Sequence, residues 1–261
     1  MQEFKSWQAY LNFEYAVKQQ TRYVRDAVGE EFLRTVLITG EKRIETISSD
    51  SFVWRAQLGN CWEKVCQDNE HVDNKPVPYP PERMKPLKDR AKEGRANPKG
   101  IPYLYVATDP EPALAEVRPW VEERISVGQF KIRRPLRVVN CTIHDKASRI
   151  YVGGEPCPKE REESVWSSID KAFATPVTSA ENLADYAPTQ IIAELFKVKK
   201  KLDGIKYRSS LGSGHNIALF DLNAADLIDR FLFEIESIKY KVKKITGQWA
   251  DAGVSQWEYV I

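Results

Sequence analysis

The prolines of this chain are unevenly distributed, and their positions limit what it can fold into. Of the 15 prolines among 261 residues, seven lie within residues 73–102: Pro76, Pro78, Pro80, Pro81, Pro86, Pro98 and Pro102. Proline lacks a backbone N–H and fixes φ, so we predict a long irregular loop here, of the kind that often carries function. The charges from Arg83 to Lys99 fit either a solvated face or a surface that attracts anions, and composition does not separate the two.

The residues before this loop have helical periodicity. One apolar stripe recurs at helical spacing: Phe4, Trp7, Leu11 and Tyr15. A looser stripe runs from Leu33 to Ile47. We predict that residues 1–49 form an N-terminal helical extension, whose aromatic stripe contacts the core of the main domain rather than a ligand.

The rest of the chain alternates between short strand-like and helix-like segments. Helices are predicted from Asp109 onward and at residues 162–173 and 183–196. Strands are predicted at residues 51–56, 101–107, 129–142 (twice, with a turn near Arg134), 219–221 and 233–245. These elements predict an α+β fold with a split mixed β-sheet surrounded by helices. We expect the main domain to span residues 50–261, with its motifs at 50–222 and a C-terminal strand region at 223–261.

Composition excludes some classes of function. The hydrophobic fraction of 42% and the charged fraction of 29% are ordinary for a globular domain, and the net charge of +2 does not indicate a nucleic-acid or membrane partner. The chain lacks an apolar run of membrane-spanning length and a signal-peptide pattern, so we expect it to be cytoplasmic. The four cysteines fit neither a disulfide framework nor a zinc site, and we predict no metal.

One stretch, residues 94–116, combines three kinds of chemistry in a short distance. A polar turn carries Arg95 and Asn97, an apolar run carries Tyr105, and Glu116 follows the predicted helix start at Asp109. A cation, an aromatic ring and a carboxylate are the groups needed to hold an anionic dinucleotide and to stabilise positive charge on a sugar.

Four segments, read together, resemble the RES domain family. They are Val53-Trp54-Arg55-Ala56; Gly94-Arg95-Ala96-Asn97 with Leu104-Tyr105-Val106-Ala107 and Ala113-Leu114-Ala115-Glu116; Tyr186-Ala187-Pro188-Thr189-Gln190; and Asp203 to Ser210, closed by Asn216 to Phe220. The resemblance implies a compact fold related to ADP-ribosyltransferases, with NAD+ bound in a cleft as substrate and no other cofactor. Family members are toxins that deplete NAD+ or transfer ADP-ribose, and an Xre-type antitoxin blocks them.

Carried over by motif, the resemblance assigns the functional positions of this chain. Arg95, Tyr105, Glu116 and Ser209 match the catalytic positions, and Arg55 matches an arginine that points into the cleft. Asn97, in the same turn as Arg95, joins the substrate-binding set. The chain departs from the family pattern at three places: Glu93 precedes Gly94, Ala96 replaces an aromatic residue, and Arg208 stands where proline is frequent.

The chemistry of these residues agrees with that assignment. Breaking the nicotinamide–ribose bond develops positive charge on the sugar, which the Glu116 carboxylate would stabilise. Arg95 and Arg55 would pair with the pyrophosphate, because guanidinium binds phosphate oxygens through two hydrogen bonds. Tyr105 could stack on nicotinamide or bond a ribose hydroxyl, or it could be an ordinary core tyrosine. Ser209 could bond a phosphate or ribose oxygen.

The sequence leaves several alternatives open. The acceptor of the ADP-ribose group could be water, phosphate or a protein side chain. The chain could instead be a non-catalytic nucleotide-binding module that acts through a protein partner. A nuclease is disfavoured, because the chain has no paired carboxylates or histidines at the spacing of a metal site. We expect NAD+ and an antitoxin as partners, without membrane or direct nucleic-acid contact. Five polar residues have weaker functional signals: His71, His144, His215, Gln190 and Glu194.

Overall fold

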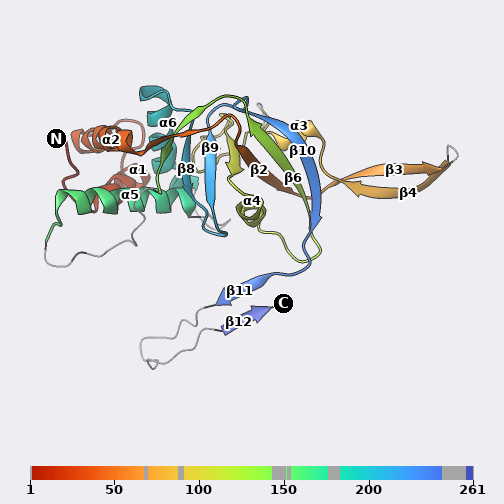
Figure 1. Cartoon of the computed structure of the whole chain (residues 1–261). Coiled ribbons are helices and arrows are strands. Elements are labelled where there is room, and N and C mark those ends of the chain that lie inside the picture. The colour runs from red at the N-terminus through yellow and green to blue at the C-terminus, as the bar shows by residue number, and fades with distance from the viewer. Residues whose placement is uncertain are drawn as a thin grey trace.

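A single large β-sheet organises the chain (Figure 1). The computed structural model describes residues 2–67, 70–87, 91–142, 151, 154–175, 183–242 and 257–260. Eight strands form the sheet in the order β1-β7-β8-β9-β5-β2-β6-β10. Their bounds are β1 Ile44–Ile47, β2 Phe52–Leu58, β5 Leu104–Ala107, β6 Arg124–Ile132, β7 Leu136–Asn140, β8 Gly204–Arg208, β9 His215–Leu219 and β10 Ala225–Glu234.

The sheet is mixed and is almost divided in its middle. Strands β7 and β8 are parallel, and the other neighbouring pairs are antiparallel. Strand β2 pairs with β6 along its whole length, but it meets β5 at one position, where Trp54 is opposite Ala107. The mixed α+β fold predicted from the sequence is confirmed, and the split falls between β2 and β5.

Helices cover one face of the sheet at its β1–β8 end (Figure 1). They are α1 Ala9–Gln19, α2 Ala27–Gly40, α5 Pro158–Ala174 and α6 Ala187–Lys199. Their buried side chains form one core with the sheet, and the helices contribute the fully buried rings of Trp166, Phe173 and Phe196 to it. Successive side chains of β5 point to opposite faces of the sheet. Tyr105 packs on this core, whereas Leu104 packs on a second core at the other face. That second core includes Met84 of α3 (Pro81–Met84).

The N-terminal residues are helical as predicted, but two details of that prediction are wrong. Of the predicted stripe, Leu11 and Tyr15 are exposed, because α1 starts at Ala9 and turns Tyr10, Phe13 and Val17 inward instead. The looser stripe does not stay helical to Ile47. Helix α2 ends at Gly40, where a Cβ would lie 2.7 Å from the Phe196 ring, and Ile44–Ile47 forms edge strand β1.

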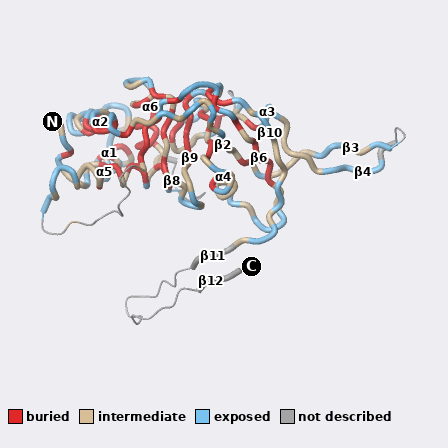
Figure 2. Tube along the Cα trace, viewed as in Figure 1, coloured by how far each residue is buried: buried red, intermediate tan, exposed pale blue. Residues whose placement is uncertain are grey.

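The proline-rich stretch is largely irregular, as predicted, but it also contains a strand that the sequence analysis missed. Strand β4 (Glu70–Val77) pairs with β3 (Cys61–Gln67) in a hairpin arm that projects from the sheet (Figure 1). Both strands of the arm are edges, so Pro76, which lies opposite Trp62, removes no interior ladder hydrogen bond. Most of the arm is exposed, whereas the buried residues gather in the sheet and under the helices (Figure 2).

Most of the other predicted elements agree with the structure in type, but three details differ. The strand predicted at residues 219–221 is misplaced, because β9 ends at Leu219, and strand β8 was not predicted. The strand predicted at residues 233–245 is interrupted, because β10 ends at Glu234 and residues 235–238 are not strand. Strands β6 and β7 flank the turn at Arg134, and α4 (Pro110–Glu116) follows Asp109. At the C-terminal end, β11 (Lys239–Val242) pairs with β12 (Trp257–Val260), while residues 243–245 of the predicted strand lie outside the described residues. Within the described residues, no helix has the length and apolar character needed to cross a membrane.

Candidate functional site

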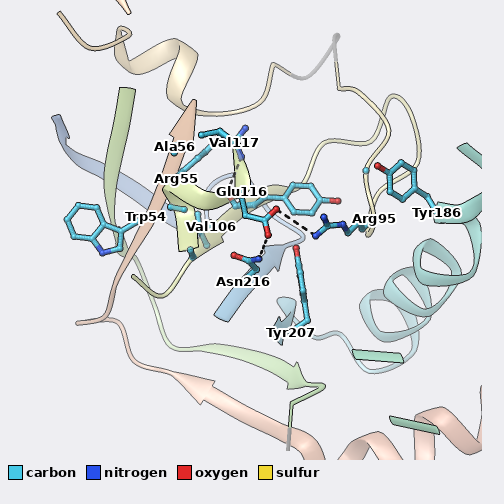
Figure 3. A pocket seen from close by; sticks show the side chains of 14 residues that line it. Trp54, Arg55, Ala56, Arg95, Val106, Glu116, Val117, Tyr186, Tyr207 and Asn216 are labelled. Atoms are coloured by element: carbon cyan, nitrogen blue, oxygen red, sulfur yellow. Dashed lines mark hydrogen bonds and ion pairs between the residues drawn. The ribbon is translucent and has the colours of Figure 1, made fainter. Parts of the chain in front are cut away.

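A cavity of about 300 Å³ opens at the point where β2 and β5 diverge (Figure 3). A single pairing joins these strands, so their backbones separate beside it and leave space between side chains. Helix α4 forms one wall and the turn carrying Arg95 forms another. The lining residues are Trp54, Arg55, Ala56, Gly94, Arg95, Tyr105, Val106, Ala107, Ala113, Glu116, Val117, Tyr186, Tyr207 and Asn216.

Tyr105 supports the turn that carries Arg95. The Tyr105 hydroxyl accepts a hydrogen bond from the Ala96 N–H at 2.9 Å and donates one to Asn97 Oδ1 at 2.7 Å. A Cβ at Gly94 would lie 2.7 Å from the same hydroxyl, so this position requires glycine. Burial raises the pKa of Tyr105 well above its ordinary value, which keeps the hydroxyl protonated. The hydroxyl is therefore engaged in the turn, and the ring is the part that faces the cavity.

Asn97 shapes the same turn from within. Its Nδ2 donates to the carbonyl oxygens of Lys92, Pro98 and Ile101 at 3.0, 3.2 and 2.8 Å. The residue is 2% exposed and does not line the cavity. The polar atoms of its side chain are used inside the turn, and direct binding of substrate by Asn97 stays a prediction.

Helix α6 holds the turn from the other side. Thr189 Oγ1 donates to the Arg95 carbonyl oxygen at 2.6 Å. Gln190 Nε2 donates to the carbonyl oxygens of Gly94 at 2.9 Å and Asn97 at 3.0 Å. Gln190 thus connects α6 to the turn and fixes the backbone from which Arg95 extends. Glu194, further along α6, is exposed and does not line the cavity.

Glu116 and Arg95 face each other inside the cavity. Glu116 is the last residue of α4, and its Oε2 lies 3.8 Å from Arg95 Nη1. Its other oxygen, Oε1, accepts a hydrogen bond from Asn216 Nδ2 at 2.7 Å (Figure 3). The side chains of Arg95 and Glu116 are 14% and 28% exposed. The pair is therefore sheltered but open to a ligand that enters the cavity.

Arg55 spans the gap between the two strands. It lies in the middle of β2, and its Nη1 donates to the Tyr105 carbonyl oxygen at 3.0 Å, where a ladder bond would otherwise form. Its Nε is buried, and none of the described residues accepts a hydrogen bond from it. Burial lowers the pKa of Arg55 to about 10, so the guanidinium still carries its charge at neutral pH.

Several lining residues were not among the predicted site residues. Tyr207 and Asn216 are directly paired across β8 and β9, so both side chains point to the same side. The Tyr207 hydroxyl lies beside Arg95 and Glu116, and burial raises its pKa above the ordinary value. The aromatic side chains of Trp54 and Tyr186 also line the cavity. All four lie in the motif segments, but only strand pairing shows which way they point.

Ser209 does not line the cavity. It starts the loop between β8 and β9, where its N–H donates to the Gly214 carbonyl oxygen and its Oγ accepts from the Leu211 N–H. That loop instead meets α4 through Ser213, whose Oγ donates to Glu111 at 2.8 Å. The structure therefore brings together Arg55, Arg95, Tyr105 and Glu116 but leaves Ser209 outside.

Among the described residues, no three His, Cys, Asp or Glu side chains are arranged to hold a metal ion. The four cysteines are free, and Cys141 is buried. His144 and the His71 side chain lie outside the described part of the structure.

We predict that His215, at the start of β9, makes the free energy of unfolding depend on pH. Burial, followed by the charge of Lys206, lowers the pKa of His215 in the folded chain. The unfolded chain then binds more protons below about pH 6.5, so acidification through that range costs stability. We expect urea midpoints at pH 7.5 and 5.5 to differ less in His215→Gln than in the parent chain. Equal differences in both would contradict this.

Comparison with known proteins gives the family. The family model of the RES domain matches residues 71–240, which is more than half of the chain. The chain belongs to the RES domain family. Arg55 precedes the matched segment, yet the structure places it in the cavity with Arg95 and Glu116, so β2 completes this RES domain site.

The other comparisons add little. A search of curated proteins finds no match. A search of solved structures finds the crystal structure of the M. tuberculosis MbcT-MbcA toxin-antitoxin complex, with a TM-score of 0.40 and 13% sequence identity, covering 76% of this chain and 92% of that one. A likeness this weak does not say what the present chain binds.

The structure also accounts for two departures from the family pattern. Ala96 is fully buried on the core side of the turn, with its N–H bonded to Tyr105. Arg208 forms an ion pair with the fully buried Asp170 of α5. Neither residue lines the cavity, so neither departure changes the lining of this RES domain site.

Proposed function

We propose that this RES domain protein degrades NAD+ by breaking the bond between nicotinamide and ribose. The observation that carries the proposal is the Glu116 carboxylate, fixed by Asn216 and facing Arg95 in a sheltered cavity with aromatic walls. This arrangement places a negative charge where a cationic sugar can meet it, beside cations that can hold phosphates.

The two oxygens of Glu116 have separate tasks in this proposal. Oε1 is held by Asn216, which fixes the orientation of the carboxylate. Oε2 faces the cavity and is 3.8 Å from Arg95, beyond a short hydrogen bond. A substrate whose phosphate draws Arg95 toward itself would leave Oε2 to stabilise the oxocarbenium-like charge that develops on the ribose.

Arg95 and Arg55 are the phosphate ligands in this proposal. Both line the cavity, and the buried Nε of Arg55 has no hydrogen-bond partner in the structure. An unpaired buried donor is costly, so an anion that accepts from it would relieve that cost. The partly exposed rings of Trp54 and Tyr186 provide flat walls against which nicotinamide could stack.

The test is to incubate the purified chain with NAD+ and to measure released nicotinamide, with and without added phosphate or cell lysate. Release without additives indicates water as the acceptor, whereas release that depends on phosphate or on lysate indicates phosphate or a protein. Tight NAD+ binding without nicotinamide release under any of these conditions would favour the non-catalytic binding module instead.

The biological role follows from the family resemblance. We propose that the chain is the cytoplasmic toxin of a toxin–antitoxin pair and that an Xre-type antitoxin blocks the cavity. Induced expression should arrest growth and lower cellular NAD+, and co-expression of a neighbouring helix-turn-helix protein should restore growth. Normal growth with unchanged NAD+ would contradict the toxin role.

Tyr207→Phe tests how Arg95 is positioned. The change removes the hydroxyl that lies beside Arg95 and Glu116 but keeps the buried ring. We expect kcat/KM for NAD+ cleavage to fall about tenfold, because one hydrogen bond to a charged group is worth about 1.5 kcal/mol. Tyr10→Phe, at a buried tyrosine of α1 that does not line this cavity, is the matched control. Equal activity in both variants would exclude a role for the Tyr207 hydroxyl.

A further inference from the structure

A second cavity, of about 530 Å³, adjoins the first. The two cavities share Arg55, Gly94 and Tyr105, so they meet where Arg55 crosses the gap between β2 and β5. The second cavity extends from this point under the proline-rich loop. Its volume is in the range of small-molecule sites, and neither the family match nor the catalytic proposal assigns it a role.

The lining of the second cavity carries an excess of positive charge. Among the described residues, four cations line it, Arg55, Arg83, Lys85 and Lys92, against one carboxylate, Glu93. Within the described part of the chain, none of the four forms an ion pair. Glu93 accepts a hydrogen bond from Gln190 at 3.1 Å. Cations that outnumber the carboxylates of a cavity favour an anionic ligand.

The cations differ in how they are held. The Arg83 guanidinium stacks on the Tyr79 ring, 3.7 Å from its centre, which pre-orients it. Lys85 Nζ donates to the Ala225 carbonyl oxygen at 2.6 Å, so it is partly committed to the fold. Lys92 is exposed, and its backbone carbonyl oxygen accepts a hydrogen bond from Asn97. Arg83 and Lys92 are therefore the cations best placed to meet a ligand.

The cavity also has an apolar side. Leu87, Pro102 and Tyr103 line it together with the cations. Burial raises the pKa of Tyr103 to about 12, so its ring stays uncharged. An apolar wall beside cations suits a ligand that combines a flat base with a phosphate, and arginine is well suited to a phosphate on the 2′-oxygen of an adenosine ribose.

We propose that the second cavity binds the far nucleotide of the substrate and that Arg83 and Lys92 select a phosphate on its ribose. The protein would then cleave NADP+ at least as well as NAD+. This inference rests on the proposed function: with the nicotinamide ribose at Glu116 and the pyrophosphate at Arg55, the far nucleotide continues into the second cavity. A plain adenosine would leave the charges of Arg83 and Lys92 without a counter-charge.

The first test is binding without turnover. Adenosine 2′,5′-bisphosphate lacks a nicotinamide bond, so its affinity does not depend on the proposed reaction. By calorimetry we expect it to bind the full chain at least about tenfold more tightly than adenosine 5′-monophosphate. The double variant Arg83→Gln/Lys92→Gln should remove most of that difference, whereas Lys99→Gln, an exposed lysine of the same loop, should retain it.

The second test is specificity. The ratio of kcat/KM for NADP+ to that for NAD+ should be one or more in the parent chain and should fall about tenfold in the double variant. Equal affinity for the bisphosphate and the monophosphate, or full displacement of the bisphosphate by an equal concentration of inorganic phosphate, would overturn the subsite. Tight, 2′-phosphate-dependent binding of the bisphosphate without any nicotinamide release would support the subsite and overturn the proposed reaction.

Discussion

Replacing Glu116 with glutamine should reduce NAD+ cleavage by a factor on the order of 100 to 1,000, with the fold retained. Glutamine keeps the shape of the side chain and an oxygen that can accept from Asn216 Nδ2, so the end of α4 should stay in place. What is lost is the negative charge facing the cavity and Arg95. The expected deficit in nicotinamide release is therefore in kcat more than in KM, because the charge on the ribose develops in the transition state.

The matched control is Glu111→Gln on the same helix. Glu111 is exposed and accepts from Ser213, outside the cavity. Its variant should cleave NAD+ as the parent chain does. If Glu116→Gln retained more than about a tenth of the parent rate, another group would have to stabilise the ribose cation, and the assignment of Glu116 would be wrong.

Replacing Asn97 with alanine should lower the free energy of unfolding by about 3 kcal/mol. The change removes the two Nδ2 hydrogens, which are shared among three carbonyl oxygens, and the acceptor of the Tyr105 hydroxyl. That is equivalent to three hydrogen bonds, each worth about 1 kcal/mol in a buried setting. A loss of this size is a large fraction of the stability of an ordinary domain. The change in the free energy of unfolding is measured by urea denaturation, provided that the m-value is the same in the variant and the parent chain.

The matched control is Lys99→Ala, because Lys99 is exposed in the same turn. It should change the free energy of unfolding by less than about 0.5 kcal/mol. A loss below about 1 kcal/mol for Asn97→Ala would mean that water replaces the Asn97 side chain without cost. The turn would then not depend on this residue to hold Arg95.

The location of the cavity has a simple structural cause. Strand β2 keeps its full ladder with β6, while its ladder with β5 is reduced to the pair Trp54–Ala107. Arg55 supplies a side-chain hydrogen bond to β5 where the backbones part. The separation gives side chains from β2, β5, β8 and β9 access to one space, which a fully paired sheet would close.

The sequence predicted those parts of the site that lie close together in the chain. The turn with Arg95, the strand with Tyr105 and the helix ending at Glu116 follow one another within residues 94–116, so local patterns were sufficient to find them. Helices α5 and α6 and the turn between β6 and β7 were predicted for the same reason, because each depends on residues that are close together in the chain. The hairpin arm was missed because its prolines and charges resemble those of a loop, and a two-stranded arm tolerates both.

The roles of individual residues were less predictable. Asn97 and Tyr105 are polar residues in a motif, which favoured direct contact with substrate, yet the hydrogen bonds among them hold the turn. Ser209 lies in the right segment, but the loop turns it away from the cavity. A motif gives the type of residue at a position, whereas the direction of its side chain depends on the backbone around it.

The sequence by itself determined the α+β class, the family and the order of cation, aromatic ring and carboxylate in residues 94–116. Tertiary structure alone decided that Arg55 reaches Tyr105 across 50 residues and that Asn216 holds Glu116 across 100. It also placed Tyr207 beside Arg95 and joined a second, basic cavity to the first. Local periodicity reports which face of an element is buried, but long-range strand pairing decides which faces meet.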